Sequence, residues 1–310
     1  MVITASCASD STNHPASAPA GSPARAAPRT ASFRVEVTGH GPPMILIPGL
    51  ASSGDTWTTT VERLRDRYTC HVLTLAGFAG VPPIQGPLLP AVEAELARYI
   101  EAQRLARPVI VGHSLGGELA LEFAADHPAL VGPLVIVDSL PFLGVVVNAT
   151  TAEDAKPTIE KIRAGMGAQT QAQYEAVTRS GAMTKSMVAT PADHQRLIGW
   201  GVASDRTTVA EAFLALLGTD LRPKLERITG PVLVIGTWIG WSAGPGAPGR
   251  ETFLQTFHDQ YASLRQLHFV MSETAHHFVM FDELPWFLGQ LDGFLADPDA
   301  AVRDRGFPAQ

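Results

Sequence analysis

The chain has 310 residues, of which 45% are hydrophobic and 17% charged, so it is long and apolar enough to bury a large core. Its formal net charge is -7 and it has no run of lysine or arginine, which argues against nucleic acid or an anionic membrane surface as the main partner. A small apolar ligand fits this charge and composition better. No apolar run approaches the roughly 20 residues that a membrane-spanning helix needs.

The first thirty residues are rich in Ala, Ser and Pro and predict a disordered leader over 1–30. They lack the basic start and apolar centre of a complete signal peptide. A run of small residues ending at Cys7 would also fit the remnant of a lipoprotein signal. We therefore take the cytoplasm as the default compartment, with export or a lipid anchor as the alternative, while compartment and oligomeric state stay open. The second cysteine, Cys70, falls in an expected strand, so no disulfide framework is predicted.

Apolar stretches that suit buried strands alternate with stretches of helical periodicity from Phe33 onward. The predicted strands cover 33–37, 44–47, 70–75, 109–113, 134–138, 232–236 and 267–271. The predicted helices cover 57–67, 92–107 and 115–126, a stretch around 253–261, and 287–295. Because most of these strands are apolar on both faces, the pattern predicts an α/β fold whose doubly wound, mostly parallel sheet is covered by helices on both sides.

Between residues 139 and 227 the sequence predicts helices without strands, over 151–165, 169–186, 190–203 and 207–217. Thr190, Pro191 and Asp193 supply an N-cap, a first-turn proline and an acidic third position for one of them. We therefore expect an all-helical cap over 139–227, inserted into a core formed by 31–138 and 228–297. A polar tail covers 298–310.

A possible nucleophile lies where the strand over 109–113 breaks into a helix. The sequence Gly112-His113-Ser114-Leu115-Gly116 matches the nucleophile elbow, a sharp strand-to-helix turn that holds a serine hydroxyl clear of the sheet. Glycines two residues before and after the serine remove Cβ atoms that would collide at such a turn. A serine needs a base to take its proton and an acid to orient that base, so further groups must be found.

The chain carries three motifs in a set order: Leu46-Ile47-Pro48-Gly49, the elbow around Ser114, and a late Ala275-His276-His277-Phe278. Together they make the chain resemble the α/β-hydrolase superfamily over roughly 31–296. The resemblance implies the α/β-hydrolase fold and a serine hydrolase. It implies Ser114 as nucleophile, His277 as base with His276 as its structural neighbour, and the backbone N–H groups of Leu50 and Leu115 as the oxyanion hole.

The acid is the point at which this chain departs from the usual family pattern. The family usually places an aspartate a few residues after the strand here ending at Gly236, but this chain continues Thr237-Trp238-Ile239. Some members instead place the acid at the end of the strand that follows the elbow helix, which here is Asp138. We therefore expect Asp138 as the acid. Glu251, or a dyad without an acid, is the alternative.

Several large apolar residues near the expected site could line a pocket between the sheet and the cap. The candidates are Phe142, Leu143, Trp238 and Trp241. No cofactor and no metal are expected, because His40, His71, His113, His127 and His268 lack metal-ligand spacing and the glycines of the elbow are not followed by the Lys-Ser/Thr of a phosphate loop.

The sequence thus predicts a cofactor-free carboxylic ester hydrolase that acts through an acyl-serine intermediate on a small or medium apolar ester. Thioester, lactone, amide and carbon-carbon cleavage and acyl transfer use the same groups and stay open. Epoxide and haloalkane hydrolysis are disfavoured, because members with these activities have an aspartate where this chain has Ser114. A weakly catalytic ligand-binding protein on the same fold is the alternative of a different class.

Overall fold

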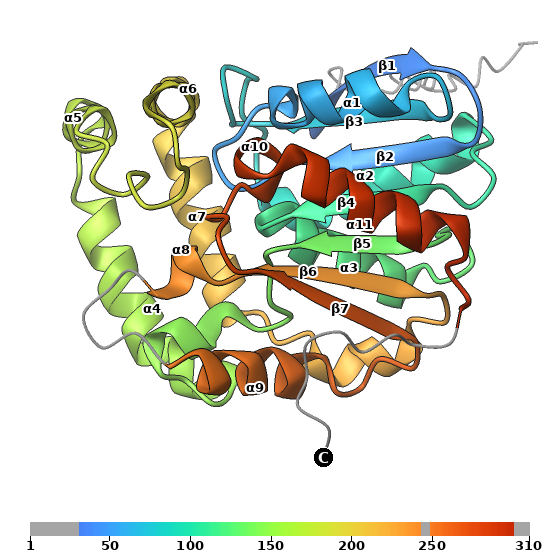
Figure 1. The fold of residues 1–310 in the computed structure, drawn as a ribbon. Helices are drawn as coiled ribbons and strands as arrows, with labels where there is room; N and C mark the ends of the chain where they lie inside the picture. Colours follow the sequence, from blue (N-terminus) through green and yellow to red (C-terminus); the bar gives the residue numbers. More distant parts are fainter. Residues whose placement is uncertain (1–30, 243–248, 301–310) are drawn as a thin grey trace, which may run out of the picture. The chain divides into compact units, whose positions relative to one another are not determined.

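The computed structural model describes residues 31–242 and 249–300, and its centre is a seven-stranded sheet (Figure 1). The strand order is β1-β3-β2-β4-β5-β6-β7, and β1 alone runs antiparallel to its neighbour. The strands are β1 (Phe33–Gly39), β2 (Pro43–Ile47), β3 (Thr69–Leu75), β4 (Val109–His113), β5 (Leu134–Val137), β6 (Val232–Thr237) and β7 (Leu267–Ser272). The predicted fold class is confirmed.

Helices cover both faces of the sheet, as the two-sided apolar strands predict. One face packs against α2, α3 and α9, and the other against α1, α10 and α11. The bounds of these helices are α1 (Thr58–Leu64), α2 (Leu88–Ala102), α3 (Leu115–Asp126), α9 (Arg250–Tyr261), α10 (Val279–Asp282) and α11 (Leu284–Ala296). Short 3-10 helices cover Gly54–Trp57, Leu143–Val147 and Arg222–Arg227, and α8 covers Ile239–Ser242. No helix in the described part of the chain is long and apolar enough to cross a membrane.

The segment between β5 and β6 is helical and lies beside the sheet, at the left of Figure 1. It contains α4 (Ala152–Gly167), α5 (Gln171–Arg179), α6 (Pro191–Val202) and α7 (Arg206–Gly218). Thr190 caps α6 by accepting a hydrogen bond from the Asp193 N–H, and Pro191 occupies the first turn, as predicted. We call α4 to α7 with their connections the helical segment; its domain boundaries stay a prediction.

The predicted helix over 169–186 is wrong in its second half. α5 ends at Arg179, and Gly181 has a φ of +68°, a left-handed conformation that terminates helices and favours glycine. A methyl group on Gly181 would lie 2.6 Å from the His194 ring of α6, so the chain also passes α6 too closely for a side chain. The turn redirects residues 181–189 toward the core.

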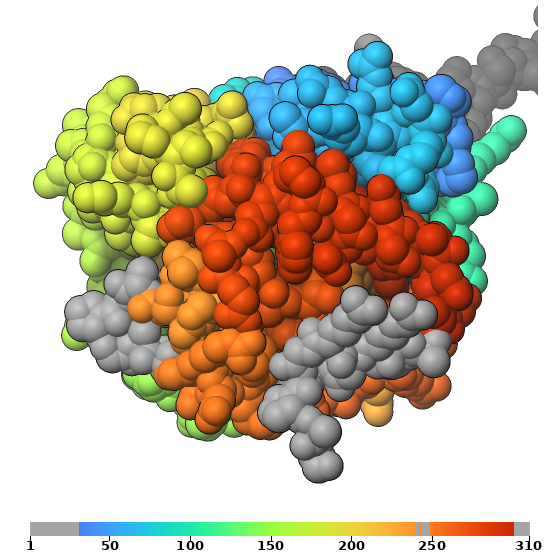
Figure 2. Space-filling view, viewed as in Figure 1, coloured from blue at the N-terminus to red at the C-terminus, as the bar shows by residue number. Residues whose placement is uncertain are grey.

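Backbone hydrogen bonds attach the helical segment to two loops at the edge of the sheet. On one side, the Asp205 N–H donates to the Gly77 carbonyl at 2.7 Å, and the Gly80 N–H donates to the Ala203 carbonyl at 3.0 Å. On the other side, the Phe278 N–H donates to the Met187 carbonyl at 3.2 Å. Figure 2 shows the side chains of α6 abutting the α10 region on this face, and the ring of Trp200 on α6 lies 6.4 Å, between centroids, from that of Phe281 on α10. The helical segment therefore bridges the loop after β3 and the loop after β7.

Candidate active site

Ser114 stands in a strained turn between β4 and α3. Its backbone has φ 52° and ψ -121°, a conformation that residues other than glycine rarely adopt. The turn is possible because its glycines leave room: a methyl group on Gly112 would lie 2.2 Å from the Gly116 carbonyl oxygen, and one on Gly116 would lie 2.4 Å from the Ile47 carbonyl oxygen. The predicted elbow geometry is thus present in the backbone.

The loop after β2 lies directly against Ser114. A methyl group on Gly49 would lie 3.1 Å from Cβ of Ser114, which brings the following residue, Leu50, next to the elbow. The Ser52 hydroxyl donates to the Leu50 carbonyl at 3.2 Å and so fixes the peptide that follows. Leu115 is the first residue of α3, where N–H groups lack partners within the helix. Neither the Leu50 nor the Leu115 N–H donates to an acceptor among residues 31–242 and 249–300.

Asp138 and His277 meet although 139 positions separate them in sequence. Nδ1 of His277 lies 2.5 Å from Oδ2 of Asp138, and the other carboxylate oxygen accepts the Thr237 N–H at 3.0 Å. Asp138 follows β5 with a φ of 44° and is 2% exposed. Thr237 lies at the end of β6, the strand after which the family usually carries its acid. The alternative acid, Glu251, lies exposed in the first turn of α9.

Because Nδ1 of His277 faces a carboxylate, it carries the proton, and Nε2 is the nitrogen left to act as a base. The Ser114 N–H donates to the Val137 carbonyl at 2.9 Å, which ties the elbow to the residue before Asp138. The ring of His277 lies 4.5 Å, between centroids, from the ring of His113, the neighbour of Ser114. The structure therefore brings Ser114, Asp138 and His277 together at one edge of the sheet.

His276, the neighbouring histidine, has a carboxylate of its own. Its Nδ1 lies 2.9 Å from Oδ2 of Asp282, and its N–H donates to the same oxygen at 2.8 Å. The other oxygen of Asp282 accepts the Ala189 N–H of the helical segment at 2.9 Å. His276 thus belongs to the attachment between the helical segment and the loop that carries His277.

The four predicted pocket residues differ in their surroundings. Phe142 has no exposed surface and packs among buried residues of the helical segment, with the Arg222 guanidinium 4.7 Å from its ring centroid. In this structure it therefore belongs to the core and not to an open surface. Leu143 and Trp238 are half-buried, and the Trp238 ring lies 5.5 Å from that of Phe253. The side chain of Trp241 lies outside the described residues.

Two helices that pack against the sheet near the site, α3 and α9, carry buried ionisable groups that the sequence did not single out. The Tyr261 hydroxyl donates to the Ser139 carbonyl at 2.7 Å, and burial, with smaller contributions from Asp138 and Glu118, raises the pKa of this phenol well above its ordinary value. Burial, followed by the charge of Glu122, raises the pKa of Glu118 well above the usual range of a carboxyl group. Glu118 lies in the first turn of α3 and is 3% exposed. These groups fall in helices and offered no motif.

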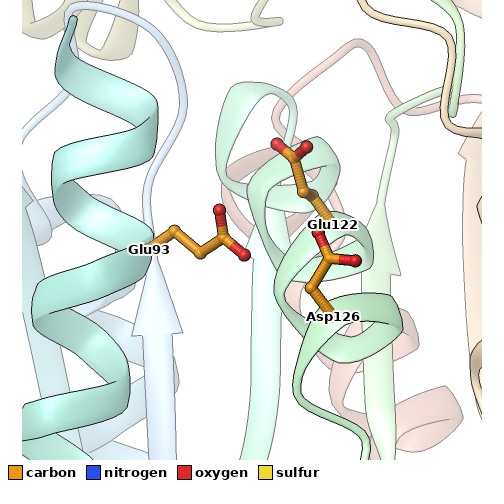
Figure 3. A group of neighbouring side chains, drawn as sticks. All are labelled: Glu93, Glu122 and Asp126. Atoms are coloured by element: carbon orange, nitrogen blue, oxygen red, sulfur yellow. The ribbon is translucent and has the colours of Figure 1, made fainter.

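A cluster of three carboxylates on α2 and α3 is formed by Glu93, Glu122 and Asp126 (Figure 3). One oxygen from each lies within 4.8 Å of the others, a spacing at which they could bind one metal ion. Lys224 already supplies a cation there: its Nζ lies 3.1 Å from Oε1 of Glu122 and 2.9 Å from Oδ2 of Asp126. Arg227 adds a second contact to Asp126 at 2.7 Å. We interpret the cluster as an ion-pair network that fastens the segment after α7 to α3.

Comparison with known proteins gives the family. Residues 44–289 match the family described as "Alpha/beta hydrolase family", and the chain belongs to it. A pimeloyl-[acyl-carrier protein] methyl ester esterase of Vibrio atlanticus is 27% identical over 215 residues, which cover 64% of this chain and 76% of that protein.

Solved structures of the same fold include an esterase from Exiguobacterium antarcticum and an enol-lactonase from Burkholderia xenovorans. The first has a TM-score of 0.69 at 17% identity over 87% of this chain and 98% of the other, and the second has 0.68 at 17% over 86% and 96%. The comparisons confirm the expected class, a hydrolase of the α/β-hydrolase fold, and agree with carboxylic ester hydrolysis.

Proposed function

We propose that the protein hydrolyses a small or medium carboxylic ester through an acyl-serine intermediate. The observation that carries the proposal is the 2.5 Å contact between His277 and the buried carboxylate of Asp138, beside a serine in a strained elbow. A histidine held by a buried carboxylate next to an activated serine is the arrangement that nucleophilic acyl transfer needs.

In the proposed reaction, Oγ of Ser114 attacks the ester carbonyl carbon while Nε2 of His277 takes the hydroxyl proton. The carbonyl oxygen becomes an oxyanion that accepts hydrogen bonds from the N–H groups of Leu50 and Leu115. Collapse of this intermediate breaks the bond to the alcohol oxygen, which leaves with the proton from His277. Water then attacks the acyl-serine in the same way and releases the carboxylic acid. Asp138 keeps His277 in the required tautomer and stabilises the transient imidazolium.

The finer choice of substrate follows from the relatives and from the composition of the site. The Vibrio atlanticus relative acts by name on a methyl ester of an acyl chain, so we propose alkyl esters of short or medium acyl chains as the first class to test. The half-buried Leu143 and Trp238 supply apolar surface suited to such a chain. Thioesters and lactones would pass through the same acyl-serine.

The test is hydrolysis of p-nitrophenyl acetate, butyrate and octanoate and of dimethyl pimelate by the wild type and by Ser114→Ala. We expect turnover that the substitution lowers by several orders of magnitude. A fluorophosphonate should label the wild type at Ser114, located by peptide mass, and should leave Ser114→Ala unlabelled. Turnover that is equal in the two proteins, or labelling at another serine, would contradict the proposal. Failure on all substrates with intact labelling would instead point to another acyl class.

A further inference from the structure

His113, the residue before Ser114, lies where three parts of the site meet. It is the last residue of β4 and has no exposed surface. Its Nε2 lies 2.9 Å from the carbonyl oxygen of His277, and its ring lies 4.4 Å, between centroids, from that of Phe278. On its other side, a methyl group on Gly49 would lie 3.1 Å from Nδ1. His113 therefore contacts the elbow, the loop of the base and the loop of Leu50.

The hydrogen bond fixes the protonation of this imidazole. A carbonyl oxygen only accepts, so Nε2 of His113 must carry the proton and donate it. Nδ1 has no hydrogen-bond partner in the described part of the chain, which leaves it as the unprotonated nitrogen. Burial, followed by the charge of His277, holds the pKa of His113 well below its ordinary value. The residue is accordingly a neutral Nε2–H donor.

This donor fixes the part of His277 that Asp138 does not reach. Asp138 fixes the ring of His277 at Nδ1, whereas His113 fixes its backbone at the carbonyl. A ring held at Nδ1 alone could still move with its loop. With both ends held, Nε2 of His277 keeps a set position relative to the elbow, because His113 and Ser114 are consecutive residues.

We propose that His113 is a positioning residue, which sets the backbone of His277 against Ser114 and Gly49 through its Nε2–H. The assignment rests on the proposed function in that His277 is taken as the base. Its contribution should appear in kcat more than in KM, since it acts on the geometry of the reacting groups. Small misplacements of reacting groups cost on the order of 100-fold in rate.

Three variants separate positioning from mere packing. His113→Phe keeps a ring of similar size and removes the donor. His113→Gln places an amide N–H close to the position of Nε2 and should restore the bond. His71→Phe is the matched control: this buried histidine on β3 bonds the Tyr99 hydroxyl at 2.7 Å, outside the site. Each variant is assayed for ester hydrolysis, and its histidine N–H protons are recorded by NMR.

The proton shared by His277 and Asp138 should give a low-field resonance, because the contact is short, and its loss in Asp138→Asn assigns it. We expect His113→Phe to lower kcat by about 10- to 100-fold with KM changed less than about threefold, and to broaden or remove this resonance. His113→Gln should recover most of both, and His71→Phe should keep both.

A His113→Phe protein that keeps the resonance and keeps kcat within about threefold of wild type would overturn the proposal. If the wild type shows no Ser114-dependent turnover, the resonance decides alone: its loss in His113→Phe but not in His71→Phe supports positioning even though the proposed function fails. If His113→Phe does not fold, His113→Asn replaces it, because its shorter side chain cannot reach the carbonyl. Equal behaviour of the Asn and Gln variants would then overturn the proposal.

Discussion

At the scale of single residues, the acid can be tested directly. Asp138→Asn keeps the size of the side chain but removes the charge and the single tautomer that it imposes on His277. We expect kcat to fall by up to about 10⁴-fold, by analogy with the same change in a serine protease. Glu251→Gln is the control and should leave kcat unchanged. A loss of less than about tenfold in a folded Asp138→Asn would remove this carboxylate from the proposed triad.

The backbone strain at Ser114 predicts that replacing this residue by glycine abolishes activity but raises stability. A non-glycine residue in this conformation lowers the stability of the folded state by about 1–3 kcal/mol. Ser114→Gly removes this strain, but glycine also gives the unfolded chain more conformational entropy, which offsets part of the gain. We expect Ser114→Gly to be inactive but about 1 kcal/mol more stable to urea than the wild type. Ser114→Ala, which keeps the strain, should show no gain. Equal stabilities of the Gly and Ala variants would contradict the assignment of strain.

The sequence predicted Ser114 and His277 because motifs surround them, whereas Asp138 was expected only because some members of the family that the chain resembles carry their acid at that strand end. Its contact with His277 depends on the pairing of β5 with β6, which no local pattern records. His113 lay within the elbow motif, yet its bond to a carbonyl 164 positions away is a tertiary contact. Phe142 was expected in the pocket from its position in the chain, and its packing beneath Arg222 could not be read from sequence.

At the scale of elements, Asp282 connects the helical segment to the loop that carries His276 and His277. Asp282→Asn replaces one of the two carboxylate oxygens with an NH2 group, so the side chain can no longer accept from the Ala189 N–H and from the N–H and Nδ1 of His276 at once. Loss of bonds to a charged acceptor costs about 1.5–3 kcal/mol each, so the amides around Ala189 and His276 should exchange hydrogen at least about tenfold faster. Hydrogen-exchange mass spectrometry measures this. Glu153→Gln, at an exposed ion pair on α4, is the control. If the amides near Ala189 exchange at the wild-type rate in Asp282→Asn, Asp282 does not hold the helical segment to this loop.

The strands were predicted within one or two residues because their apolar runs are bounded by glycine, proline or polar residues. α5 was predicted to run to residue 186, whereas it ends at Arg179 and is followed by the left-handed Gly181. Met183 is 70% exposed, so this apolar residue marked no buried face. Periodicity records which positions are apolar but not the single backbone angle that redirects the chain.

At the scale of the whole molecule, Glu118 should make folding weaken as pH rises. Its folded-state pKa lies well above the value of 4.5 that it has when solvated, so between these two values the unfolded chain has lost a proton that the folded chain retains. Fewer protons on the unfolded chain mean that the free energy of unfolding falls with pH, by up to about 1.4 kcal/mol per unit.

Glu118→Gln removes the titrating carboxyl group from both the folded and the unfolded chain. Urea unfolding at pH 5, 6, 7 and 8 should therefore show a stability gain for the variant over the wild type that grows with pH until the folded-state carboxyl ionises. Glu36→Gln, at an exposed strand residue, should show no such trend. A difference between Glu118→Gln and the wild type that is constant with pH would contradict a buried neutral carboxyl group.

The loop after β7 presents two identical imidazoles in succession, each on its own aspartate, so nothing in the side chains themselves decides which one faces the serine. The backbone decides: the His276 N–H is bound by Asp282, the His277 carbonyl by His113, and the Phe278 N–H by Met187. These three backbone hydrogen bonds, made by three consecutive residues, fix the register of the loop. A shift by one residue would put one histidine in the place of the other, and it would have to break all three hydrogen bonds at once.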